Sequence, residues 1–240
     1  MIDTLRDAER IVALCGAGLS AESGIPTFRE AQTGLWAKHD PMTLASPEGF
    51  ERQPELVWRW YQWRRSLVAR AEPNAGHHAL AELQHRRPAT RLISQNVDGL
   101  QQRAGSEDVL ELHGNLSRTI CSRTRKRIDR QWLNDHSDLS PPPSPYHPDG
   151  RARPEVVWFG EALDPDTFQQ AVEASRDCDL MLIIGTSGLV HPAASLPLLG
   201  QENGARLIEI NPQRTALTER VDWYWPQTSA SALPTLVQSL

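Results

Sequence analysis

The sequence predicts an α/β fold, built as a doubly wound parallel sheet with helices on both faces. Two observations support it. Short runs made almost entirely of apolar residues are typical of strands that are buried on both faces. Helical stretches separate these runs, and strands that alternate with helices are typical of parallel sheets. The expected strands are residues 11–15, 91–95, 109–112, 180–185 and 205–210.

Two helices between these strands have recognisable beginnings. Pro54 is expected to be the first helical residue of the stretch 54–70, because proline is favoured at that position. The stretch 164–177 is expected to form a helix that begins near Asp164 or Asp166. The polar N-terminal residues 1–12 also have a helical composition.

One segment, residues 117–154, breaks this pattern. It begins with Arg and Lys residues and contains four prolines between 141 and 145. Proline lacks a backbone N–H group and has a fixed φ, so regular structure is excluded there. We expect a surface insertion or a small module.

Composition limits the possible functions. With 240 residues and a formal net charge of −5, the chain suits one globular domain and has no global positive field to capture nucleic acid. The N-terminus lacks the apolar core of a signal peptide, and no later segment has the length of a membrane span. Three widely spaced cysteines, Cys15, Cys121 and Cys178, indicate reduced thiols. We expect a cytoplasmic enzyme with no nucleic-acid or membrane partner; the oligomeric state is left open.

A glycine-rich loop follows the first expected strand. Gly16 and Gly18 come directly after it, and Gly24 follows in the same loop. Such a loop lets a backbone approach a pyrophosphate, but it can equally be a tight turn. The usual dehydrogenase pattern would place an acidic residue about 20 residues further on. The sequence has no clear candidate at the end of a second strand.

Five motifs in order give the chain a specific resemblance. They are GAGLSAESGIPTFR (16–29), QNVDGL (95–100), LHGN (112–115), VVWFGE (156–161) and GTS (185–187). Together they resemble the sirtuins, the NAD-dependent protein deacylases. The resemblance implies a single catalytic domain over 1–240, with a Rossmann-like sheet and a smaller module formed by insertions at about 36–79 and 117–154. It also implies NAD as cofactor and an acylated lysine on a protein as substrate.

The resemblance assigns the catalytic roles. It makes His113 the base that acts on the ribose hydroxyls while the substrate's amide oxygen attacks the anomeric carbon. Nicotinamide is released and an O-acyl-ADP-ribose forms. Asn96 and Asp98 are expected to hold the nicotinamide carboxamide. Judged alone, Asn96 and Asp98 could be turn formers and His113 a structural histidine.

The other expected contacts also follow from the matching motifs. Phe28 and Arg29 resemble a loop that closes over NAD, and Asn211 resembles an adenosine contact. The expected cofactor contacts are Gly16, Ala17, Gly18, Ser20, Ala21, Thr27, Phe28, Arg29, Gln95, Asn96, Asp98, Gly185, Thr186, Ser187, Asn211, Ser229 and Ala230. The VVWFGE run could be an ordinary edge strand; in the family it pairs with the substrate backbone, here through Val157, Phe159 and Gly160.

The expected zinc site departs from the family pattern. Sirtuins usually carry two CxxC pairs, but here the four positions are Cys121, Thr124, Ser144 and His147. Neutral hydroxyls are poor zinc ligands, even if His136 adds a third nitrogen or sulfur ligand. We expect no zinc, and a module that depends on packing through Trp132 and Tyr146 or is partly mobile.

The aromatic-rich helix suggests an acyl preference. Most of its aromatic residues are expected in the core. Tyr61 and Arg64 are three residues apart and so share a face. With Ala45, they match the pattern of sirtuins that act on acidic acyl groups, for which a guanidinium and a phenol are suited. A packed Tyr beside a surface Arg is the alternative.

The sequence therefore predicts an NAD-dependent lysine deacylase for succinyl or malonyl groups, with acetyl as a further substrate class. A mono-ADP-ribosyltransferase or NAD glycohydrolase is one alternative, in which a protein acceptor or water would intercept the activated sugar. A non-catalytic NAD-sensing or protein-binding module is another, favoured by the degenerate zinc motif.

Overall fold

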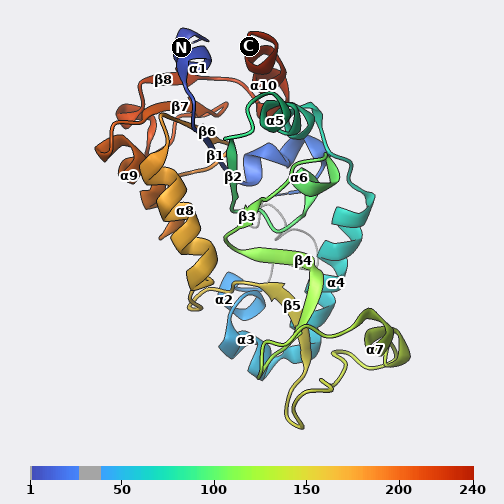
Figure 1. Cartoon of the computed structure of the whole chain (residues 1–240). Coiled ribbons are helices and arrows are strands. Elements are labelled where there is room, and N and C mark those ends of the chain that lie inside the picture. Colours follow the sequence, from blue (N-terminus) through green and yellow to red (C-terminus); the bar gives the residue numbers. More distant parts are fainter. Residues whose placement is uncertain (1, 27–38) are drawn as a thin grey trace. The chain divides into compact units, whose positions relative to one another are not determined.

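Six parallel strands form the larger sheet, in the order β3-β2-β1-β6-β7-β8 (Figure 1). The structure is a computed structural model that describes residues 2–26 and 39–240. The strands are β1 (Ile11–Cys15), β2 (Arg91–Ser94), β3 (Leu110–Glu111), β6 (Leu180–Ile184), β7 (Arg206–Ile210) and β8 (Trp223–Trp225). The predicted parallel α/β sheet is confirmed.

All five expected strands are present, and their observed ends lie within one residue of the expected ones. The sixth strand, β8, is missing from the sequence-based assignment. Its three aromatic residues are only half-buried, and it pairs with β7 alone at the edge of the sheet. A short edge strand lacks the continuous apolar run that marks the central strands.

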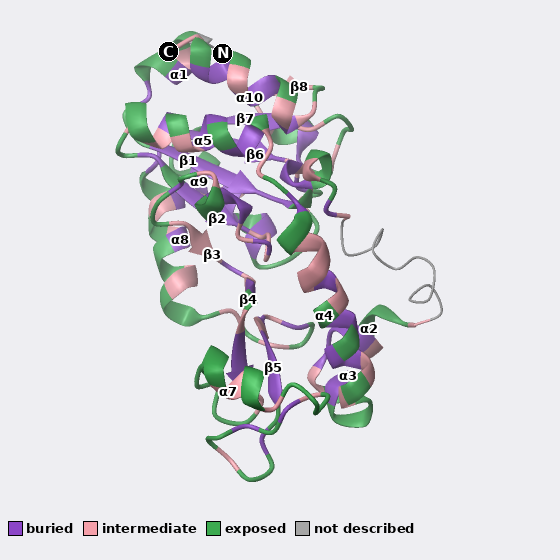
Figure 2. Ribbon diagram, turned by 90° about the vertical axis from the view of Figure 1, so that its right-hand side faces the viewer, coloured by how far each residue is buried: buried purple, intermediate pink, exposed green. Residues whose placement is uncertain are grey.

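Alternation along each strand divides the buried side chains between two faces. In β1, Ile11 and Ala13 join one apolar cluster, while Val12 and Leu14 join another. This period of two follows from the pleat of a β-strand. The central strands are coloured as buried in Figure 2.

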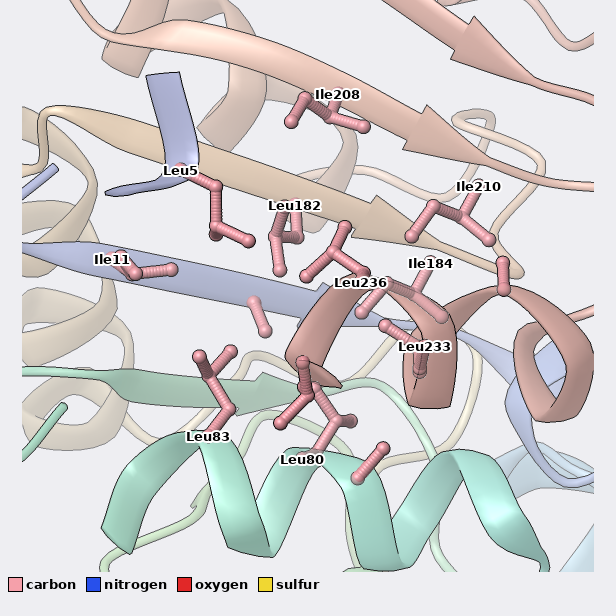
Figure 3. Packing of buried hydrophobic residues seen from close by; sticks show 14 of the residues in the cluster. Leu5, Ile11, Leu80, Leu83, Leu182, Ile184, Ile208, Ile210, Leu233 and Leu236 are labelled. Atoms are coloured by element: carbon pink, nitrogen blue, oxygen red, sulfur yellow. The ribbon is translucent and has the colours of Figure 1, made fainter. Parts of the chain in front are cut away.

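Helices cover both faces of the sheet. On the first face, Leu80 and Leu83 of α5 and Leu233 and Leu236 of α10 pack against the strands, as Figure 3 shows. Fully burying one such side chain contributes about 1.5–3 kcal/mol. On the second face the cluster includes residues of α8 and α9. The bounds are α1 (Ile2–Asp7), α5 (Ala75–Arg86), α6 (Leu100–Arg103), α8 (Pro165–Asp177), α9 (Leu196–Glu202) and α10 (Ser229–Gln238).

Helix starts follow the expected capping chemistry. Pro54 is the first residue of α4 (Pro54–Arg70), as predicted. The Asp164 side chain accepts a hydrogen bond from the Thr167 N–H at 2.9 Å and caps α8. Such a cap satisfies one of the backbone donors left unpaired at the start of a helix. None of the helices in the described ranges combines the length and apolarity needed to cross a bilayer.

The chain forms two compact units. The first holds the six-stranded sheet and comprises, within the described residues, 2–26, 71–112 and 163–240. The second comprises 39–70 and 113–162 of the described residues. Its two segments overlap the expected insertions 36–79 and 117–154, whose boundaries remain predictions.

The second unit contains an antiparallel pair, β4 (Gly114–Cys121) and β5 (Ala152–Val156), with a register shift between Asn115 and Thr119. Its helices are α2 (Pro41–Leu44), α3 (Pro47–Arg52), α4 and α7 (Arg130–Asp135). Arg65 of α4 donates hydrogen bonds to the carbonyl oxygens of Leu116 and Arg118, at 2.6 and 2.8 Å. The guanidinium thereby satisfies backbone acceptors where the strand register is irregular.

The structure excludes one alternative for this unit and differs from one expectation. The run Val156–Glu161 is not an edge strand, because β5 ends at Val156 and a turn follows, with Gly160 at φ 86° and a hydrogen bond from Glu161 N–H to the Trp158 carbonyl. Tyr146 lies at the surface, 42% exposed and beneath the Lys126 ammonium, and is not part of the apolar cluster of this unit. Trp132 does pack against the apolar cluster around Cys121.

The glycine at the end of β6 gives a test of the fold. A Cβ atom on Gly185 would lie 2.6 Å from the backbone carbonyl carbon of Gly18, and its φ is +57°. Gly204 has a φ of +95° but open space around it. We expect Gly185→Ala to lower the free energy of unfolding by about 1–3 kcal/mol more than Gly204→Ala, which carries only the backbone strain. Urea unfolding of both variants measures the difference; equal losses would contradict the close packing.

Candidate active site

Two loops meet closely where β1 and β6 end. The Gly16 N–H donates to the Ile184 carbonyl and the Gly18 N–H to the Gly185 carbonyl, both at 2.8 Å. A Cβ atom on Gly16 or on Gly18 would lie 2.7 Å from backbone atoms of the β6 loop. The bare backbone of this glycine loop is therefore required by a neighbouring loop of the protein itself.

This meeting point is a topological switch point of the sheet. From β1, the strand order runs through β2 and β3 in one direction and through β6, β7 and β8 in the other. Parallel sheets bind ligands beyond the carboxyl ends of their strands at such a point. The 3-10 helices Ala17–Leu19 and Ala21–Ser23 follow β1 directly and place short polar residues there.

Ser20 is the centre of a buried hydrogen-bond cluster at this edge. Its hydroxyl donates to Asp98 Oδ2 at 2.7 Å and accepts from Asn96 Nδ2 at 3.2 Å. Asn96 Nδ2 also donates to the Gly16 carbonyl at 3.0 Å, and Asp98 Oδ1 accepts from the Leu100 N–H at 2.9 Å. The structure thus brings together Ser20, Asn96 and Asp98, three of the expected cofactor contacts, with their side chains held by these hydrogen bonds.

A neutral histidine completes this cluster. His77 is fully buried, and its Nε2 lies 3.4 Å from Ser20 Oγ. Its Nδ1 accepts from the Asn74 N–H at 3.2 Å, so the ring proton of the neutral form is on Nε2, facing Ser20. Burial, with a smaller effect of the His78 charge, lowers the pKa of His77 to about 4.

Three further expected residues form a hydrogen-bonded row along the carboxyl edge of the sheet. Gln95 Nε2 donates to Thr186 Oγ1 at 3.0 Å, and Asn211 Nδ2 donates to the Thr186 carbonyl at 3.1 Å. Gln95 follows β2, Thr186 lies just after β6, and Asn211 follows β7. Hydroxyl and amide groups are therefore aligned along the carboxyl edge of the sheet, where the ribose and adenosine contacts are expected.

The start of α10 joins the glycine loop. Ser229 Oγ donates to the Gly18 carbonyl at 3.3 Å, and the Ala230 N–H donates to Glu22 Oε2 at 3.1 Å. The structure therefore places Ser229 and Ala230 beside that loop, although they lie more than 200 residues later in the chain. The expected contacts Ala17 and Ala21, at the starts of the two 3-10 helices, and Ser187, after β6, are exposed.

Some expected site residues belong to the second unit or lie outside the described residues. Thr27, Phe28 and Arg29, the expected loop over NAD, lie outside the described residues. His113 belongs to the second unit, directly before β4, and is half-buried. Its carbonyl oxygen accepts a hydrogen bond from the Val157 N–H at 2.9 Å, so the expected base and the expected substrate-binding segment are joined through their backbones.

The expected acyl-binding residues are gathered in the second unit. The Phe159 N–H donates to the Ala45 carbonyl at 2.9 Å, which joins the segment 157–160 to the end of α2. Tyr61 and Arg64 are both buried on α4, with exposed fractions of 4% and 9%. Burial raises the pKa of Tyr61 to about 12, although the neighbouring Arg64 charge acts in the opposite direction. The phenol therefore keeps its proton and lies within the electrostatic reach of Arg64.

The expected zinc positions form a hydrogen-bonded knuckle in place of four thiolates. Cys121 is fully buried, and its sulfur accepts from the N–H groups of Arg123 and Thr124, both at 3.4 Å. Burial opposes ionisation of this thiol, but hydrogen bonds from Ser144, Thr124 and the backbone lower its pKa overall. A Cβ on Gly150 would lie 2.8 Å from the Cys121 sulfur and 3.1 Å from the Cβ of His147.

This donor set does not fit a structural zinc. Such sites use four nitrogen or sulfur ligands in tetrahedral geometry, and two of the four positions here carry hydroxyls. His136 lies elsewhere, stacked on Trp132 at 4.1 Å. Among the described residues, no three His, Cys, Asp or Glu side chains are grouped so that they could hold a metal ion. Hydrogen bonds close the knuckle instead.

Sequence reasoning did not find two polar members of the site, Asn74 and His77. Asn74 caps α5 through its side chain and also donates to the Leu19 carbonyl at 2.8 Å. The sequence did contain a signal, since an Asn three residues before a polar partner is typical of a helix N-terminus. That signal predicts a cap but not its contact with the glycine loop.

Comparison with known proteins decides the family. Residues 16–192 match the Sir2 family. An NAD-dependent protein deacylase of Aquifex aeolicus is 46% identical over 93% of this chain and 92% of its own length. NAD-dependent protein deacylase 1 of Pseudomonas aeruginosa is 48% identical over 89% of this chain and 87% of its own length. The chain belongs to the Sir2 family.

Solved structures agree with this membership. A Sir2 homologue in complex with NAD matches with a TM-score of 0.90 and 41% identity, over 99% of this chain and 91% of that one. A Sir2 structure with a p53 peptide and NAD⁺ matches with a TM-score of 0.87 and 29% identity, over 99% and 95%. The predicted sirtuin family, the Rossmann-like fold and the enzyme class, an NAD-dependent protein deacylase, are thereby confirmed.

The carboxyl edge of the first unit fits NAD as the cofactor. Two 3-10 helices follow β1 directly, and the Ser20 cluster and the Thr186 row supply amides and hydroxyls along the edge. These groups match the needs of a dinucleotide, which are hydrogen-bond donors for the phosphates and paired donors and acceptors for the riboses and the carboxamide.

The buried His77 predicts a pH-dependent stability. Its pKa is about 4 in the folded protein, against 6.5 for an ordinary histidine, so the unfolded chain binds a proton more readily. This contribution is fully present above pH 6.5 and is lost as the pH falls toward 4. We expect it to amount to about 3 kcal/mol at most.

Urea unfolding between pH 7 and pH 4 measures this effect. The stability of His77→Gln should fall less steeply with decreasing pH than that of the wild type. His78→Gln, at an exposed neighbour, should keep nearly the wild-type slope. Identical slopes for the wild type and His77→Gln would show that His77 titrates normally.

The knuckle predicts that folding is independent of zinc. Purified protein should contain far less than one zinc per chain, and its melting temperature should not change in a chelator, because structural zinc contributes directly to folding. Elemental analysis and thermal unfolding with and without chelator measure both. Stoichiometric zinc together with unfolding in the chelator would contradict the prediction.

Proposed function

We propose that this NAD-dependent protein deacylase acts on acidic acyl groups, and removes succinyl or malonyl from lysine side chains. The observation that carries the proposal is the pairing of Tyr61 with Arg64, a phenol and a guanidinium buried on one helix face. A surface Arg beside a packed Tyr, the alternative, does not agree with an Arg64 that is only 9% exposed. A guanidinium binds carboxylates through charge-assisted, bidentate hydrogen bonds, so Arg64 on this buried face suits an acidic acyl group.

The two side chains would divide the recognition of the carboxylate. Arg64 offers its positive charge and a planar set of donors, which suits bidentate contact with two oxygens. Tyr61, whose pKa is about 12, remains protonated at neutral pH and can donate one further hydrogen bond. Ala45, at the end of α2, has a small side chain that leaves room for a longer acyl chain.

The remaining residues of the chain would prepare the reaction. When bound, NAD supplies the ribose carbon that accepts the amide oxygen of the acyl-lysine. Asn96 and Asp98, oriented by Ser20, would hold the carboxamide through amide and carboxylate hydrogen bonds. His113 would take a proton from a ribose hydroxyl as a general base. Phe159, whose N–H binds the Ala45 carbonyl, would hold the substrate segment beside the acyl pocket.

Product analysis tests the activity. The protein is mixed with NAD and a succinyl-lysine peptide, and the products are identified by mass spectrometry, with His113→Ala as the inactive control. Deacylated peptide together with O-succinyl-ADP-ribose is the expected result. ADP-ribosylated peptide, free ADP-ribose without deacylation, or no product would support a transferase, a glycohydrolase or a non-catalytic module respectively.

Substitution of Arg64 tests the acyl preference. Arg64→Met keeps length and apolar bulk but removes the charge, and we expect kcat/KM for the succinyl peptide to fall by roughly 30- to 5,000-fold, the effect of removing one partner of a desolvated charge pair. The acetyl peptide has no carboxylate and should be affected much less.

Arg59→Met is the matched control, because Arg59 is exposed on the same helix. It should leave both substrates unaffected. A similar loss for succinyl and acetyl peptides in Arg64→Met would mean that Arg64 supports the fold. A wild-type enzyme without preference for succinyl or malonyl peptides would refute the proposed pocket.

A further inference from the structure

Polar contacts and a cation converge on Trp158, a side chain to which the proposed function gives no role. Its indole N–H donates to the Tyr61 hydroxyl oxygen at 2.9 Å, and its backbone N–H donates to Glu161 Oε2 at 2.9 Å. The guanidinium carbon of Arg153 lies over its ring, 3.3 Å from the centroid. Trp158 is only 3% exposed. Arg153 holds the face of its ring, Tyr61 its N–H edge and Glu161 its backbone.

Arg153 and Glu161 form the ion pair that holds this arrangement. Arg153 Nη1 donates to Glu161 Oε1 at 2.6 Å, and Nη2 donates to Oε2 at 2.9 Å. Nη2 also donates to the Val156 carbonyl at 2.9 Å. The side chains are 4% and 15% exposed. Burial opposes ionisation of Glu161, but its hydrogen bonds and the Arg153 charge lower its pKa overall, so the pair is ionic.

The contact with Trp158 fixes the role that the Tyr61 hydroxyl can play. A phenol has one proton to donate and an oxygen that accepts. The indole N–H occupies the oxygen as an acceptor, so the phenol proton must be directed elsewhere. Within residues 39–70 and 113–162, this is the one hydrogen bond that the structure gives the Tyr61 hydroxyl. A cation over the indole face also draws electron density from the ring and makes its N–H a stronger donor.

We propose that Trp158, held by the Arg153–Glu161 pair, is a specificity-determining positioning residue that reserves the Tyr61 proton for the carboxylate of an acidic acyl group. The inference rests on the proposed acyl pocket and adds residues that orient Tyr61 without contacting the acyl group. Trp158 acts through Tyr61, and Arg153 and Glu161 act through Trp158. Acyl preference then depends on the orientation of the Tyr61 hydroxyl as well as on its presence.

A double-mutant cycle tests this relation. Trp158→Phe keeps an aromatic ring beneath Arg153 but removes the indole N–H, and Tyr61→Phe removes the hydroxyl. Values of kcat/KM for succinyl and acetyl peptides are measured for the wild type, both single variants and the double variant. We expect Trp158→Phe to lower the succinyl-to-acetyl ratio by about 3- to 10-fold, the effect of one hydrogen bond. In the Tyr61→Phe background it should change the ratio no further.

Two further variants separate positioning from stability. Glu161→Gln weakens the ion pair and should lower the same ratio. Glu155→Gln is the matched control, because Glu155 pairs with Arg118 and Arg127 in the same unit without contacting Trp158. It should leave the ratio unchanged. Activity on the acetyl peptide shows that each variant is folded and binds NAD.

The outcomes distinguish this inference from the proposed function. A wild-type enzyme without succinyl preference would refute the acyl pocket, and the inference with it. A preference that is lost in Arg64→Met but kept in Trp158→Phe would leave the pocket intact and overturn the role of Trp158. Equal losses for both peptides, or an effect of Trp158→Phe that persists in the Tyr61→Phe background, would also overturn it, because Trp158 would then act on the fold.

Discussion

The close approach of two loops, at Gly16–Gly18 and at Gly185, is the constraint on which the cofactor edge depends. Backbone touches backbone there, and the N–H groups of Gly16 and Gly18 bind carbonyls at the end of β6. Any side chain at these positions would separate the ends of β1 and β6. The Ser20 cluster and the Thr186 row are attached to these same two loops, so their relative placement depends on a contact that only glycine permits.

Much of the first unit could be predicted from the sequence because its signals are local. Strands buried on both faces read as continuous apolar runs, and Pro54 and Asp164 mark helix starts through their own chemistry. The partners of the glycines could not be predicted in this way. Gly185 follows Gly18 by more than 160 residues, and no local pattern states that their backbones meet. The same holds for His77, whose partner Ser20 lies 57 residues earlier in the chain.

The second unit was harder to predict for a different physical reason. Polar side chains make contacts within it that no local pattern announces, such as the Arg65 hydrogen bonds to β4 and the Arg153–Glu161 pair. The run Val156–Glu161 looks like a strand by composition, yet the Arg153–Glu161 pair and Gly160 turn it away after β5. Tyr146 looks like a packing residue, but it lies exposed at the surface while Trp132 packs. Aromatic composition alone cannot distinguish the two cases.

Different residues of helix α4 anchor the helix and line the proposed acyl pocket. Arg65 fixes the helix to the backbone of β4 through three hydrogen bonds, to the carbonyls of Leu116 and Arg118 and to the Thr119 hydroxyl. Tyr61, one turn earlier on the same helix, adds a separate contact, because its hydroxyl oxygen accepts a hydrogen bond from the Trp158 indole N–H. The attachment of α4 through Arg65 does not involve the Tyr61 hydroxyl. A new acyl preference could then evolve through substitutions around Tyr61 while Arg65 continues to anchor the helix.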